Sequence, residues 1–195
     1  YNTVPRLYFW LLHLVWLFPW SVYFPAAARH CFPSAYRPVD RAGRTRLMAL
    51  CWAGFLLLFF SFSTSQEYYT VPMYPALALL IGAALAKGGD WVRRGTIAAA
   101  AISAVAAVAA GFILYEVRAV PAVGDITSAL TQNPEAYTLS MGHLSDLTLQ
   151  SFAYLRGPLL LAALALAMGA IGAAALSRSR GWLALALMMV MLTQA

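Results

Sequence analysis

Apolar runs of membrane-spanning length constrain the fold of this chain more than any other feature. A helix rises about 1.5 Å per residue, so about 20 apolar residues cross the roughly 30 Å hydrocarbon core of a bilayer. Five runs approach or reach that length, and a sixth begins at Trp182 and ends with the chain at Ala195. The five occupy residues of about 7–28, 47–63, 71–86, 96–115 and 158–176.

Composition supports a membrane protein. The chain is 62% hydrophobic and 10% charged, whereas soluble domains are about half apolar and a quarter charged. We therefore predict an all-α, polytopic transmembrane helix bundle, with five full spans and a truncated sixth in a single transmembrane domain, 1–195. The chain opens with Tyr1 rather than Met and its last run is short, so we expect a fragment of a longer protein.

The basic residues alternate between connections. Ten of the thirteen lie in the connections 29–46, 87–95 and 177–181. The positive-inside rule places these connections in the cytoplasm, so 64–70 and 116–157 face outward. We predict a multi-pass protein of the cytoplasmic membrane. The net charge of +6 does not indicate a nucleic-acid partner, because most of the basic residues lie in alternate connections between the spans.

The first span carries three unusual residues. Pro19 and Pro25 have no N–H to donate to the helical carbonyls four residues earlier, which predicts kinks. His13 is an ionisable residue inside the membrane and is therefore a functional candidate. The alternative is a neutral His13 bonded to a neighbouring helix or to a carbonyl freed by a proline.

Two later spans carry small residues at a spacing of four, which lets helix backbones approach closely. These are Ala99, Ser103, Ala107 and Gly111 in the fourth span, and Ala165, Gly169 and Ala173 in the fifth. We assign packing rather than chemistry to both faces.

The connection 116–157 is the only sizeable segment between spans, and we expect short amphipathic helices in it. Asp125 can cap a helix at 126–132. Its candidate polar groups are His143, Asp146 and Arg156. The alternative is a solvated face with one apolar side packed down.

A polar, aromatic segment separates the second and third spans. Its candidate binding residues are Ser65, Gln66, Glu67, Tyr68 and Tyr69. A sugar would meet hydroxyls, an amide, a carboxylate and aromatic faces here, whereas Glu67 would repel a phosphate unless a cation intervened. The alternative is an interfacial turn anchored by tyrosines.

The residues around this segment resemble a known family. Residues 59–63 (FFSFS) and 69–80 (YTVPMYPALALL) are similar to the signature of glycosyltransferases that use a lipid carrier, the aminoarabinose-transferase and protein-mannosyltransferase-like enzymes of the GT-C fold. Residues 17–21 (LFPWS) resemble a helix of the bacterial branch, and residues 133–143 with 146–148 resemble a further segment of it.

The resemblance implies a transferase that moves a sugar from a polyprenyl-phosphate carrier to a lipid or protein acceptor on the outer face of the membrane. The family's catalytic carboxylates lie in earlier outward loops, so this fragment would hold no catalytic residue and no metal ligand. A divalent metal is compatible with the full-length protein. The family commonly places Lys or Arg before the tyrosine, where this chain has Ser65, Gln66 and Glu67. Arg6 is a candidate replacement for that cation, and its alternative role is interfacial snorkelling.

Two other functions stay open. A transporter or flippase half would share the apolar bundle, and it predicts charged or discontinuous segments near the membrane midplane. A non-catalytic membrane scaffold would need only the packing faces. No glycine-rich phosphate loop, metal-ligand spacing or nucleophile elbow occurs in the sequence.

Overall fold

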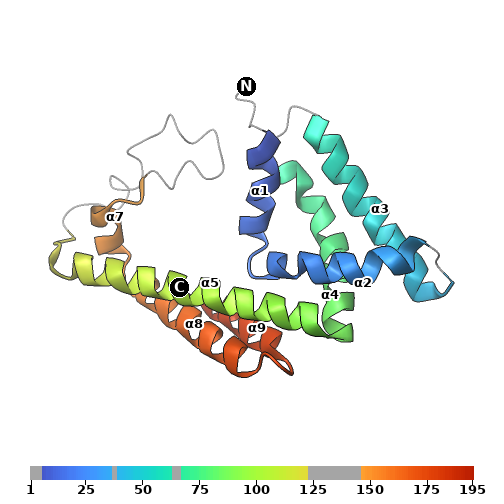
Figure 1. Cartoon of the computed structure of the whole chain (residues 1–195). Coiled ribbons are helices and arrows are strands. Elements are labelled where there is room, and N and C mark those ends of the chain that lie inside the picture. The colour runs from blue at the N-terminus through green and yellow to red at the C-terminus, as the bar shows by residue number, and fades with distance from the viewer. Residues whose placement is uncertain (1–5, 37–38, 63–66, 123–145) are drawn as a thin grey trace. The chain divides into compact units, whose positions relative to one another are not determined.

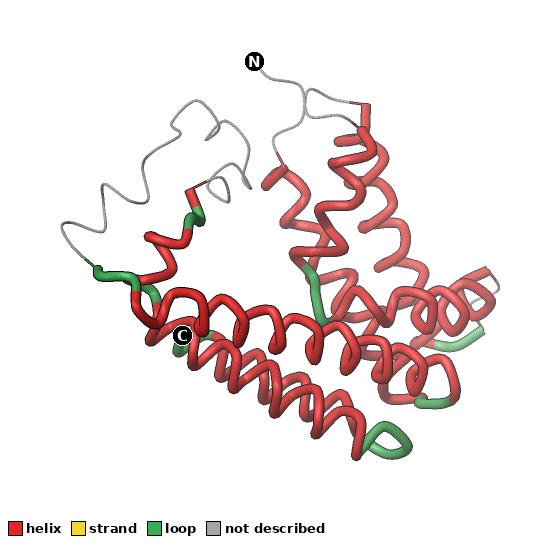
Figure 2. The backbone as a smooth tube through the Cα atoms, turned by 60° about the vertical axis from the view of Figure 1, so that its left-hand side comes forward, coloured by secondary structure: helices red, strands yellow, loops and turns green. Residues whose placement is uncertain are grey.

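The computed structural model describes residues 6–36, 39–62, 67–122 and 146–195, and in these residues every regular element is helical (Figure 2). The prediction of an all-α chain is confirmed for this part. The α-helices are α1 Arg6–Trp16, α2 Phe24–Tyr36, α3 Arg41–Phe62, α4 Tyr74–Lys87, α5 Asp90–Glu116, α7 Leu149–Tyr154, α8 Arg156–Ala175 and α9 Gly181–Leu192. The shorter 3₁₀ segments are η1 Trp20–Tyr23, η2 Glu67–Met73 and η3 Val117–Ala119.

Among the residues that the structure describes, four helical stretches are long and apolar enough to cross a membrane: Arg41–Phe62, Tyr69–Lys87, Asp90–Ala119 and Arg156–Ala175. A fifth is added if the bent pair formed by α1 with η1 and α2 is one span. Large apolar side chains point outward from these helices; Val108 is 73% exposed and Ile171 is 71% exposed. Such faces suit lipid rather than water, so the helices support a multi-pass membrane protein.

The kink that Pro19 predicts in the first span, 7–28, is confirmed, because the chain turns by 111° between Trp10–Trp16 and Trp20–Pro33 (Figure 1). Pro19 cannot donate to the carbonyl of Val15, which instead accepts from the backbone N–H of Phe18 at 3.1 Å. The hydroxyl of Ser21 donates to the carbonyl of Leu14 at 2.6 Å. Pro25 causes no second kink, because it lies in the first turn of α2, where its missing N–H costs nothing.

Two helices extend beyond their predicted ends into connections that the charges define. Helix α2 continues to Tyr36, and α3 begins at Arg41, so much of 29–46 is helical. A carboxylate oxygen of Asp40 accepts the backbone N–H of Gly43 at 2.7 Å, which caps the start of α3. The apolar run 47–63 did not predict that the helix begins at Arg41, because charged residues occupy the first turns of α3.

The chain packs as two compact units, Tyr1–Thr96 and Ile97–Ala195, which we describe separately. In the first unit α2, α3 and α4 pack against one another. The hydroxyls of Tyr23 and Thr96 form a buried hydrogen bond of 2.9 Å. Gly95 allows this approach, since a Cβ there would lie 2.9 Å from the ring of Tyr23.

In the second unit α8 and α9 form a closely packed pair joined by a turn (Figure 1). The predicted small-residue face of α8 is confirmed: Ala165, Gly169 and Ala173 are buried. A Cβ on Gly169 would lie 2.5 Å from the sulfur of Met188 on α9.

The small-residue face of α5 is confirmed only in part. Ala99 and Ser103 are buried, and the Ser103 hydroxyl lies 3.5 Å from the sulfur of Met188. Gly111 is exposed, and a Cβ there would meet no described atom within 4 Å. The spacing of four therefore overestimates the length of this packed face.

In the connection 116–157 the structure describes η3 and α7. Thr148 caps α7 by accepting the backbone N–H of Ser151 at 3.3 Å. The predicted helix 126–132, its cap Asp125 and the candidate His143 lie outside the described residues.

Candidate functional site

The polar segment lies where α3 ends and α4 begins. Figure 1 shows this place at the same end of the first unit as the start of α1. Segment η2 connects the two helices, with Pro72 inside it and Pro75 at the start of α4. Pro75 lies in the first turn of α4, where a backbone N–H is not needed, so it directs the chain into α4 without breaking the helix.

Aromatic packing fixes Tyr69 on the end of α3. The rings of Tyr69 and Phe60 lie 5.5 Å apart at 31°, and Phe60 meets Phe59 edge-on at 5.1 Å. Tyr69 remains 43% exposed, whereas its neighbour Thr70 is fully buried. Segment η2 is therefore anchored on one side and presents an aromatic face on the other.

The other predicted binding residues are placed to different extents. Glu67 and Tyr68 are the first two residues of η2, next to Tyr69. Arg6 is the first residue of α1. Ser65 and Gln66 lie outside the described residues. The backbone thus brings Glu67, Tyr68 and Tyr69 together in one short segment.

His13 joins α1 to the start of α4. Its Nδ1 lies 3.1 Å from the hydroxyl of Tyr74, and the two rings meet edge-on at 6.0 Å. His13 is only 4% exposed. The structure therefore matches the interpretation in which His13 bonds to a neighbouring helix. Arg6 precedes His13 by about two helical turns, or about 10 Å along α1.

Sequence reasoning missed the contact of Tyr74 with His13. His13 lies 61 residues earlier in the chain, so no local pattern pairs the two. A signal was nevertheless present, because a buried imidazole needs a hydrogen-bond partner and Tyr74 offers a phenol hydroxyl at the start of α4.

The candidates in the second unit have structural partners. The guanidinium of Arg156 donates to the backbone carbonyls of Val117 and Val120. Asp146 is buried, and its backbone carbonyl accepts the hydroxyl of Ser151 at 2.6 Å. The Arg156 contacts hold the start of α8 against the residues that follow α5. The contact between Asp146 and Ser151 is local to the start of α7.

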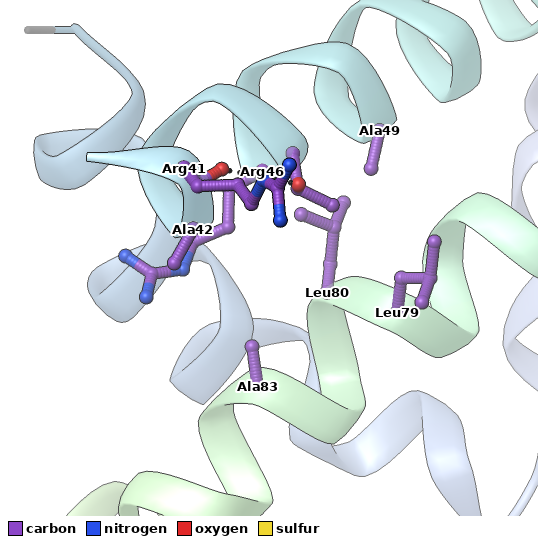
Figure 3. A pocket seen from close by; sticks show the side chains of 8 residues that line it. Arg41, Ala42, Arg46, Ala49, Leu79, Leu80 and Ala83 are labelled. Carbon is purple, nitrogen blue, oxygen red and sulfur yellow. Dashed lines mark hydrogen bonds between the residues drawn. The ribbon is translucent and has the colours of Figure 1, made fainter. Parts of the chain in front are cut away.

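The described residues contain no group of three or more His, Cys, Asp or Glu side chains that could hold a metal ion. A cavity of about 470 Å³ lies between α3 and α4 (Figure 3). Arg41 and Arg46 line it, and sequence reasoning used these residues only as markers of the cytoplasmic side.

The described helices thus define a helical protein with four or five candidate membrane spans. Comparison with family models, with curated proteins and with solved structures finds no match to this chain.

Proposed function

We propose that this chain forms the carrier-binding part of a membrane glycosyltransferase of the GT-C type. The protein would move a sugar from a polyprenyl phosphate to a lipid or protein acceptor on the outer face of the cytoplasmic membrane. One observation carries the proposal: Tyr69 is half-exposed at a helix end, held there by Phe60 and by the buried Thr70. These residues also belong to the segment that resembles the family's signature.

The residue types of this segment suit a sugar phosphate joined to a lipid. The aromatic face of Tyr69, and that of Tyr68, would cover the apolar side of a sugar ring. The carboxylate of Glu67 would accept hydrogen bonds from sugar hydroxyls. Because Glu67 repels phosphate, the carrier's phosphate would lie away from it, towards a cation such as Arg6.

The transfer step itself would depend on residues outside this chain. An acceptor oxygen attacks the anomeric carbon while the bond from that carbon to the carrier phosphate breaks. A general base takes the acceptor's proton, and the departing phosphate keeps the electron pair and is stabilised by cations or a metal. In this scheme the described residues bind and orient the donor.

A transfer assay with the full-length gene product tests the proposal. Purified protein in liposomes receives a radiolabelled sugar on a polyprenyl phosphate together with an acceptor lipid. We expect Glu67→Gln and Tyr69→Ala each to lower kcat/KM for the donor at least tenfold. Glu116→Gln and Tyr115→Ala are matched controls, because both residues are exposed at the end of α5. Unchanged kcat/KM in both site variants would refute the assignment of this segment to donor binding.

One observation favours a second function, a transporter or flippase half. The α1–η1–α2 segment is discontinuous, and discontinuous helices build the substrate sites of many transporters. The same liposomes separate the two functions. A flippase exposes the labelled carrier on the opposite leaflet without any acceptor, whereas a transferase leaves it in place and converts it only when acceptor is added. A scaffold would do neither.

A further inference from the structure

The cavity between α3 and α4 has two chemically different ends. Arg41 and Arg46 of α3 lie at one end, and Ala49 and Leu79 lie at the other (Figure 3). Leu80 and Ala83 form the wall contributed by α4. At about 470 Å³ the cavity falls within the usual range for ligand pockets.

Charge and polarity restrict what this cavity can bind. Among the described residues its lining includes two arginines and no acidic residue. Arg46 is half-buried and Arg41 is exposed. A small anion would use the arginines and leave the wall bare, and an uncharged lipid would leave the arginines without a partner. An anionic amphiphile satisfies both ends.

We propose that this cavity binds an anionic diacyl phospholipid. Its phosphodiester lies between Arg41 and Arg46, and one acyl chain runs along Ala49, Leu79 and Ala83. Arginine pairs with phosphate oxygens through parallel N–H bonds, and basic pockets between membrane helices bind anionic headgroups. Leu79 is 51% exposed, so the wall is continuous with the outer face of α4.

This lipid site is separate from the proposed sugar-carrier site. Arg41 begins the 22-residue helix α3, and Phe62, next to the polar segment, ends it. At about 1.5 Å per residue the two sites lie roughly 30 Å apart along the helix. The lipid proposal therefore does not depend on glycosyl transfer, and either one can fail alone.

Native mass spectrometry of the full-length protein in detergent provides the test. We would titrate it with dioleoylphosphatidylglycerol and with dioleoylphosphatidylcholine. One arginine near an anionic headgroup contributes about fivefold in affinity. Because two arginines line the cavity, we expect phosphatidylglycerol to bind about 25-fold more tightly than phosphatidylcholine. The double variant Arg41→Gln/Arg46→Gln should remove this preference. The control Arg44→Gln/Arg93→Gln removes the same charge from exposed residues outside the lining, and it should keep the preference.

A second pair of variants tests the apolar end without changing any charge. Ala83→Phe fills the cavity, and we expect it to weaken both lipids by at least fivefold. Ala86→Phe lies one turn further along α4, outside the lining, and should change neither. Equal binding of the two lipids by the unmodified protein, or equal losses in the two double variants, would overturn the proposal. Displacement of phosphatidylglycerol by millimolar inorganic phosphate would instead identify a site for a free anion.

Discussion

The contact between Gly169 and Met188 sets how closely α8 and α9 approach. A Cβ added at position 169 would lie 2.5 Å from the sulfur of Met188 and 2.7 Å from its Cβ and Cγ. The sulfur can rotate away, but the Cβ of Met188 is attached to the backbone of α9. Gly169→Ala must therefore push the helices apart by several tenths of an ångström.

The expected effect follows from two opposing terms. Overpacking a tight contact costs about 1–3 kcal/mol, and replacing a helical glycine by alanine returns about 1 kcal/mol. We expect Gly169→Ala to lower the free energy of unfolding by roughly 0–2 kcal/mol. Gly111→Ala is the matched control, since no described atom lies within 4 Å of its Cβ and only the helix term of about 1 kcal/mol remains. The two variants should thus differ by about 1–3 kcal/mol.

Unfolding of the protein in mixed micelles, followed by circular dichroism during titration with a denaturing detergent, measures this difference. Met188→Ala removes the atoms beyond Cβ, so in that background Gly169→Ala should cost at least about 1 kcal/mol less. If Gly169→Ala and Gly111→Ala change the unfolding free energy equally, this result would contradict the close contact between Gly169 of α8 and Met188 of α9.

Three further changes have defined outcomes in the same unfolding assay. Tyr74→Phe removes the hydroxyl that contacts His13 and should destabilise the protein by about 0.5–1.5 kcal/mol. Arg156→Gln leaves two backbone carbonyls at the end of the α5 segment without their donor and should cost about 1–3 kcal/mol. Thr148→Ala removes the cap of α7 and should cost about 0.5–2 kcal/mol, whereas Thr148→Ser should cost little. No change for any of these three would contradict the contact concerned.

The sequence predicts the helical class and most of the spans because apolar run length has a direct physical meaning in a bilayer. It predicts a kink at Pro19, but not that the chain turns by 111° between α1 and α2. The rule for Pro19 identifies a lost hydrogen bond but not the direction in which the chain continues. That direction depends on how α2 packs against α3 and α4, which no local pattern contains.

The candidate site is predicted to a similar extent. Residue types and the two prolines identify the segment around Tyr69 as a polar turn at a helix end, and the structure describes it as η2. The ring of Phe60 behind Tyr69 and the hydroxyl of Tyr74 beside His13 come from tertiary packing. The cavity at Arg41 and Arg46 is likewise a property of two helices together, so it is invisible in either helix alone.

The proposed carrier site requires that the segment around Tyr69 and the basic connections 87–95 and 177–181 lie on opposite sides of the membrane. Labelling of single cysteines with an impermeant maleimide measures this directly, after Cys31 and Cys51 are replaced by serine. We predict that Ser65→Cys is labelled from the outer side while the membrane stays sealed, and that Asp90→Cys and Ser179→Cys are labelled only after the membrane is permeabilised. Labelling of all three from the same side would contradict the account.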